Sequence, residues 1–108
     1  MAEYIHVQLK AEGQGLAVQA PLVVATDSVA RLAFDVEFSE EWGGFDAYHV
    51  AQRRGNVVRK SRVENGTALA ADDLISEPGA LEVALFATRA GERMTSERAI
   101  ISLEDSNL

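Results

Sequence analysis

The sequence predicts an all-β protein: an antiparallel sandwich or barrel of about seven to eight short strands. Apolar side chains recur at every second position in segments spaced about 10–12 residues apart, and glycine-containing turns separate these segments. No window of about ten residues shows the apolar repeat of a helix. The chain has 108 residues, enough for one domain with one core. We expect that core to extend over about residues 3–104, and the polar tail 105–108 to fray.

The clearest strand is Arg31–Phe38, where apolar and charged or small residues alternate strictly. Such alternation places the apolar side chains on one buried face. The same pattern occurs in Ile5–Leu9 and again in Leu16–Leu22, on either side of the flexible segment Glu12-Gly13-Gln14-Gly15. Two short strands about a glycine-rich turn predict a hairpin.

The second half of the chain predicts further strands separated by turns. Asn65-Gly66 is a favoured pair for a tight hairpin turn, because both residues tolerate positive φ. Asp72–Ser76 predicts one helical turn that Glu77-Pro78-Gly79 ends. Ala80–Thr88 is apolar on both faces apart from Glu82, as in a central strand. The other expected strands are Phe45–Arg53, Asn56–Val63, Thr67–Ala70 and Arg93–Leu103.

Composition and charge limit the function. The formal net charge is −7, and residues 1–50 hold eight acids against only Lys10 and Arg31. A domain this acidic repels phosphate backbones, so we expect no nucleic-acid partner. No apolar run approaches the roughly 18 residues of a membrane helix, and the first residues lack a signal-peptide pattern. We therefore expect synthesis in the cytoplasm and no membrane partner, and the absence of cysteine fits a reducing compartment.

Five basic residues lie close together in the predicted hairpin that turns at Gly55: Arg53, Arg54, Arg59, Lys60 and Arg62. On two neighbouring strands they would form a cationic stripe. One interpretation is an edge hairpin that its charges protect from edge-to-edge pairing. The other is a surface that docks onto an acidic partner, including the acidic half of a second copy.

The aromatic residues Trp42, Phe45 and Tyr48 allow two interpretations. A single tryptophan at a strand end favours a plug for the core. As an alternative, the three rings would stack on a sugar in a carbohydrate-binding module. The acids near Trp42 suggest a third, calcium-stabilised alternative, although their spacing differs from known calcium loops. These acids are Glu37, Glu40, Glu41 and Asp46.

The sequence predicts a protein that is not an enzyme and that needs no metal or cofactor. It has no nucleophile motif, no phosphate-binding glycine loop and no spacing typical of zinc ligands. The two histidines, His6 and His49, have polar or small neighbours on the same strand face and are interpreted as surface residues.

The segment Phe38-Ser39-Glu40-Glu41-Trp42-Gly43-Gly44, which ends the clearest strand, resembles a known family. It is similar to the amino-terminal immunoglobulin-like domain of baseplate upper proteins and related tail proteins from phages of Gram-positive bacteria. Glu77-Pro78-Gly79 and the final hairpin, Leu81–Thr88 with Ile100–Leu103, fit the same pattern. The resemblance covers about residues 3–104 and implies an immunoglobulin-like antiparallel sandwich.

The resemblance also implies a non-enzymatic structural role in a phage or prophage particle. The protein would act by protein–protein contact in a tail, baseplate or accessory position. Its partners would be other phage structural proteins or further copies of itself. It would be virion-associated after synthesis in the cytoplasm of the host bacterium.

Overall fold

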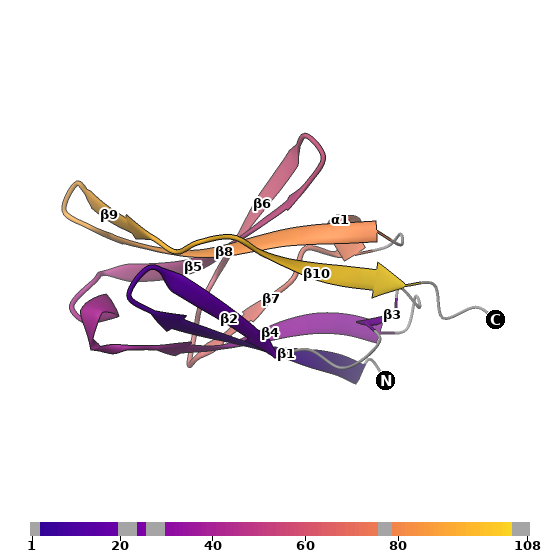
Figure 1. Cartoon of the computed structure of the whole chain (residues 1–108), viewed down its shortest axis with the longest axis horizontal. Coiled ribbons are helices and arrows are strands. Elements are labelled where there is room, and N and C mark those ends of the chain that lie inside the picture. The colour runs from indigo at the N-terminus through magenta and orange to yellow at the C-terminus, as the bar shows by residue number, and fades with distance from the viewer. Residues whose placement is uncertain (1–2, 20–23, 26–29, 76–78, 105–108) are drawn as a thin grey trace.

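The computed structural model describes residues 3–19, 24–25, 30–75 and 79–104, and it confirms an all-β protein (Figure 1). Three predicted features lie outside these residues: the frayed tail 105–108, the Glu77-Pro78 break and the 20–22 end of the second strand. The elements are β1 (Glu3–Glu12), β2 (Gly15–Gln19), β3 (Val24–Ala25), β4 (Ala30–Phe38), the 3-10 turn η1 (Glu40–Trp42), β5 (Ala47–Arg54), β6 (Val57–Arg62), β7 (Thr67–Leu69), α1 (Asp72–Ile75), β8 (Gly79–Arg89), β9 (Glu92–Thr95) and β10 (Ala99–Glu104).

Two sheets pack face to face, as expected for a sandwich (Figure 1). The smaller sheet has the order β2-β1-β4-β7, and the larger has the order β3-β10-β8-β5-β6, with β9 paired to β8. The expectation of purely antiparallel sheets was wrong, because β1 runs parallel to β4 and β3 runs parallel to β10. Between β2 and β4 the chain pairs with the other sheet through β3, and it returns to the first sheet in the direction of β1.

The core lies between the two sheets and follows the predicted alternation. In β4, Leu32 and Phe34 are buried, whereas Glu37 is exposed. In β1, the odd-numbered positions from Val7 to Ala11 face the core, and the even-numbered ones face outward. The larger sheet contributes the apolar side chains of Val50, Leu81, Val83, Leu85, Ile101 and Leu103.

The described residues form ten strands, more than the seven or eight expected. One reason is Ser96, which divides the predicted strand Arg93–Leu103 into β9 and β10. Its hydroxyl accepts a hydrogen bond from the backbone N–H of Leu85 at 2.8 Å, and its own N–H donates to the Leu85 carbonyl at 2.8 Å. Ser96 is buried beside Leu85, and the strand pairing stops there.

The Asn65-Gly66 turn forms as predicted, with φ of 53° and 79°. The strands that follow and precede it do not form the expected hairpin, however. Only Glu64 and Thr67 form a bridge across the turn, and β7 pairs with β4 in the other sheet. The turn therefore carries the chain from one sheet to the other.

Candidate functional site

The five basic residues of the predicted stripe all lie on the hairpin of β5 and β6, but they divide between its two faces. The strand register aligns Arg53, Lys60 and Arg62 on the outer face of the larger sheet. Arg54 and Arg59 alternate with them and therefore take the opposite face. The expected single stripe of five was wrong for this reason, and three of its members share a surface.

Arg54 and Arg59 fasten the hairpin to α1. Nη2 of Arg59 forms an ion pair with a carboxylate oxygen of Asp73 at 2.8 Å. Nη1 of Arg54 donates to the carbonyl of Leu74 at 3.0 Å. Both arginines thus connect the hairpin to α1, Arg59 through an ion pair at the surface.

Two further basic residues join the outer face: Arg93 of β9 and Arg98, which directly precedes β10. We call the surface of Arg53, Lys60, Arg62, Arg93 and Arg98 the cationic face. It holds half of the ten lysines and arginines of the chain. Within the described ranges, the strand register places the acid Glu82 on the cationic face. The whole chain has 17 aspartates and glutamates. Sequence reasoning missed Arg93 and Arg98, because only the pairing of β9 and β10 with β8 brings them beside the hairpin.

The ring of Phe86 lies at the centre of the cationic face, and Phe86 is only 4% exposed. His49 stacks on it, with ring centroids 4.8 Å apart and planes 10° apart. The guanidinium of Arg93 lies 4.3 Å from the ring centroid and the ammonium of Lys60 lies 5.6 Å from it. Cations are attracted to the negative face of an aromatic ring. The basic side chains therefore cover an apolar residue that would otherwise face solvent.

His49 is half-buried, and its Nδ1 atom is buried without a hydrogen-bond partner in the described part of the chain. Burial lowers the pKa of His49 below its ordinary value of 6.5, and the positive charges of Arg62, Lys60 and Arg93 lower it further. Near pH 7 the imidazole is therefore neutral, and it contributes a flat ring to the face.

A hollow of about 250 Å³ opens beside Phe86. Three arginines and one acid, Glu82, line it together with the small side chains of Ala51 and Ala84; the arginines are Arg53, Arg93 and Arg98. These two alanines leave room between the longer basic side chains. The hollow is therefore shallow, cationic and adjacent to an aromatic ring.

The positive charges of this face are weakly neutralised. Glu82 approaches Nε of Arg53 at 3.8 Å and Nη1 of Arg98 at 3.9 Å. These distances are well beyond the roughly 2.7–2.9 Å of a charge-assisted hydrogen bond. For Lys60, Arg62 and Arg93, the described residues provide no carboxylate at ion-pair distance. The face is thus prepared to receive anionic groups.

Trp42, Phe45 and Tyr48 gather at one end of the sandwich as a packed corner. Trp42 is 0% exposed, and its indole Nε1 donates to the carbonyl of Gly13 at 2.7 Å. The Tyr48 hydroxyl donates to the carbonyl of Trp42 at 2.5 Å, and the ring of Phe38 lies between the two other rings. Trp42 therefore fills the core and has no exposed ring face on which a sugar stacks.

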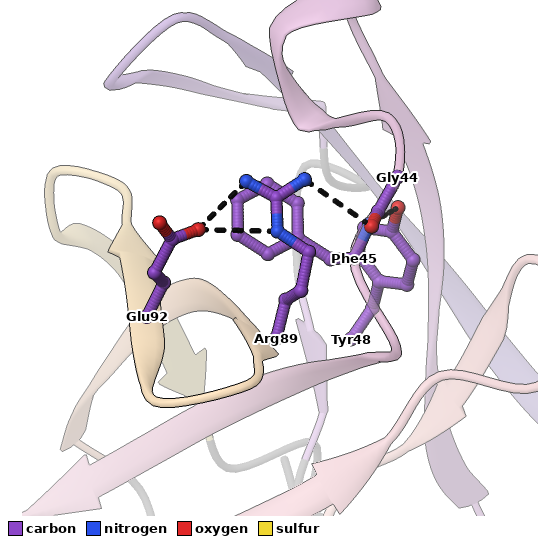
Figure 2. A network of polar contacts seen from close by, with 5 residues as sticks. All are labelled: Gly44, Phe45, Tyr48, Arg89 and Glu92. Atoms are coloured by element: carbon purple, nitrogen blue, oxygen red, sulfur yellow. Dashed lines mark hydrogen bonds and ion pairs between the residues drawn. The ribbon is translucent and has the colours of Figure 1, made fainter.

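Arg89 covers the ring of Phe45 in the same corner (Figure 2). Its guanidinium carbon lies 4.8 Å from the ring centroid. The group is held there by Glu92, to which it donates at 2.7 and 3.1 Å, and by the carbonyl of Gly44 at 3.4 Å. The Tyr48 ring meets Phe45 edge-on at 6.3 Å. One face of Phe45 is therefore occupied by an arginine of this chain.

The acids proposed for calcium are not gathered into a ligand set. Across the described ranges, no group of three or more histidine, aspartate or glutamate side chains is placed to hold a metal ion. Glu41 instead accepts hydrogen bonds from the Ser39 hydroxyl and, at 3.4 Å, from the Gly13 N–H. These bonds, the one from Ser39 above all, hold the pKa of Glu41 below its usual range.

A second hollow, of about 430 Å³, lies on the outer face of the smaller sheet. Its lining includes Lys10, Asp35 and Glu37. Nearby, His6 and Asp35 are joined by a hydrogen bond of 2.9 Å. This hollow is larger, and its charged lining residues are two acids and one base. The hollow on the cationic face has three bases and one acid, so positive charge predominates there.

Comparison with known protein families finds no family that matches this chain, and no curated protein is similar to it in sequence. No helix in the part of the chain that the structure describes is long and apolar enough to cross a membrane. The function is therefore inferred from the cationic face and from the sequence resemblance.

Proposed function

We propose that this chain is a non-enzymatic structural protein of a phage or prophage particle, in a tail, baseplate or accessory position, and that it acts through protein–protein contact at the cationic face. The observation that carries the proposal is the gathering of five basic side chains around Phe86 on a protein of net charge −7. Opposite charges on two protein surfaces orient and accelerate their association. The expected partner is therefore an acidic protein surface, on another structural protein or on a second copy.

The order of the strands supports an immunoglobulin-like sandwich. In such domains strand F lies between C and G, C′ adds beside C in variable-type domains, and B and E share the opposite sheet. The order β10-β8-β5-β6 corresponds to G-F-C-C′, and the pair β4–β7 corresponds to B and E. The β1–β2 hairpin and β9 are additions to that plan. This agreement favours the phage family that the segment Phe38–Gly44 resembles.

The particle role is tested by immunogold electron microscopy. Particles are induced from the source bacterium and probed with an antibody raised against this chain. We expect gold at one fixed position on the particles, on the tail, the baseplate or the head. Particles without gold, together with the protein in the particle-free fraction, would contradict the proposal.

The contact surface is tested by charge reversal. Products of the particle genes that adjoin the coding sequence are purified and measured for binding by biolayer interferometry. We expect Arg93→Glu and Lys60→Glu each to weaken binding strongly. Lys10→Glu makes the same charge change on the outer face of the smaller sheet, where Lys10 pairs with Glu12 at 3.2 Å, and should leave binding nearly unchanged. An equal loss in Lys10→Glu, or tight binding of the wild type to duplex DNA, would refute the proposed surface.

A further inference from the structure

Strand β6 has a free edge. It ends the larger sheet: β5 pairs with one of its sides, and no strand of the described residues pairs with the other. The hairpin of β5 and β6 projects beyond the rest of the two sheets (Figure 1). On this strand Val57 is 39% exposed and Val58 is 48% exposed. A free edge offers unpaired backbone groups and is a template for another strand.

The hydrogen-bond pattern identifies the backbone groups at this edge. Val63 directly follows Arg62, the last residue of β6, and its N–H donates to the carbonyl of Tyr48 at 2.8 Å. In an antiparallel pair, residues bonded to the partner strand alternate with residues whose N–H and C=O point away. The alternate positions Val58, Lys60 and Arg62 therefore direct their backbone groups away from β5.

One of these edge groups already has a partner within the chain. The guanidinium of Arg59 donates to the carbonyl of Val58 at 3.1 Å. The same register places the side chains of Val58, Lys60 and Arg62 on the outer face of the sheet. The residues with outward backbone groups are thus those whose side chains face the cationic surface.

We propose that an extended, acidic segment of a partner protein adds as a strand to the free edge of β6. The segment carries aspartate or glutamate at alternate positions, beside Lys60 and Arg62. Charge complementarity selects this occupant: the basic residues of β6 repel the β6 edge of a second copy, whereas carboxylates pair with them. Backbone hydrogen bonds provide affinity in strand addition, and alternate side chains provide specificity. The inference rests on the proposed function, to which it adds the chemistry of the partner and its mode of binding.

A synthetic peptide tests the predicted chemistry. The probe is a fluorescent peptide of about twelve residues in which glutamate alternates with threonine, a residue that favours strands. One control has lysine in place of each glutamate, and another has the same composition with all glutamates in one half. We expect fluorescence anisotropy to show salt-sensitive binding of the alternating acidic peptide and much weaker binding of both controls. Equal binding of the two acidic peptides, or no binding of either, would overturn the proposal.

A pair of variants separates strand addition from charge attraction. Lys60→Gln removes the charge and keeps the backbone N–H, whereas Lys60→Pro removes both. Proline is tolerated in an edge strand where its missing N–H would face outward. We expect Lys60→Pro to bind the peptide at least about fivefold more weakly than Lys60→Gln, the effect of one lost hydrogen bond. Equal affinities of the two variants for the peptide would overturn strand addition. The proposed function would still stand in that case if Arg93→Glu weakened binding to the particle proteins.

Amide hydrogen exchange of the wild type provides a measurement that needs no variant to fold. On addition of the acidic peptide, we expect slower exchange at the amides of Val58, Lys60 and Arg62. The amides of Arg59 and Ser61, which the register assigns to the β5 ladder, should change little. Unchanged exchange at the first three amides in the presence of bound peptide would refute the edge site.

Discussion

Gln52 is a buried polar residue that joins three segments of the chain, and its replacement by leucine tests how much this network stabilises the fold. It is 0% exposed. Its amide nitrogen donates to the carbonyl of Val50 at 3.0 Å and to the Ser61 hydroxyl at 2.9 Å. Its amide oxygen accepts from the N–H of Ala71 at 2.7 Å. The side chain therefore links β5 to β6 and to the segment that follows β7.

The change Gln52→Leu nearly preserves the volume of the side chain, so the lost hydrogen bonds dominate its effect. Ser61 is half-buried and its hydroxyl can turn toward water, but the N–H of Ala71 loses its acceptor at the edge of the core. An unsatisfied buried donor costs about 1–3 kcal/mol. The apolar gain of leucine offsets part of this loss. We expect a decrease of about 1–2 kcal/mol in the free energy of unfolding, a large part of the roughly 5–15 kcal/mol of a typical domain.

Urea unfolding measures this change. Trp42 is the only tryptophan of the chain and is fully buried, so its fluorescence reports loss of the core. Gln8→Leu is the matched control: the same substitution on an exposed position of the smaller sheet, where we expect a change within about 0.5 kcal/mol. If Gln52→Leu proved as stable as the wild type, or more stable, the Gln52 network would not stabilise the fold and the reasoning would be refuted.

Three further predictions follow from the core, a histidine and a turn. Trp42→Ala should lower the free energy of unfolding by about 3–5 kcal/mol, and Trp42→Phe by less, with far-UV circular dichroism as the measurement. The folded state lowers the pKa of His49, so the unfolded state protonates this imidazole at a higher pH than the folded state does. The free energy of unfolding should therefore fall as the pH drops below 6.5. In His49→Gln the urea midpoint should depend less on pH between 7.5 and 5.5. Gly66 has φ of 79°, and a Cβ added there would meet the Val36 carbonyl oxygen at 4.0 Å, an ordinary contact. Gly66→Ala should therefore cost about 1 kcal/mol through backbone strain, visible as a lower Tm.

The parts of the fold that the sequence predicts are those with a local physical cause. The alternation in Arg31–Phe38 reflects one buried sheet face, and β4 covers Ala30–Phe38. The positive φ of Asn65 and Gly66 is a property of those residue types. The parallel pairing of β1 with β4 has no such local signal, because alternation is the same in either strand direction. The break at Ser96 was missed because it depends on side-chain and backbone hydrogen bonds to Leu85 of the preceding strand, which the apolar pattern of Arg93–Leu103 does not indicate.

The candidate site was predicted in part for the same reason. Proximity in the chain brings Arg53 and Lys60 together, since one tight turn separates them. Arg93 and Arg98 reach the same face only through the pairing of β9 and β10 with β8. The burial of Trp42, whose indole donates to the Gly13 carbonyl, agrees with the core plug that the sequence favoured. Long-range pairing thus decides which basic residues make up the cationic face.

On β6 the residues whose backbone groups point to the free edge are also those whose side chains lie on the cationic face, so backbone recognition and charge recognition are coupled. Lys60 and Arg62 present both their outward backbone groups and their side chains to a partner strand at the free edge. The hydrogen-bond register of the partner strand therefore also determines which of the partner's side chains meet the positive charges. A slip of one residue turns every carboxylate of the partner to the opposite face, where Arg59 is already paired with Asp73 at 2.8 Å. A slip of two residues keeps the faces but moves one carboxylate beside Val58. The basic residues that protect this edge from indiscriminate pairing therefore also make it selective for one register of one kind of strand.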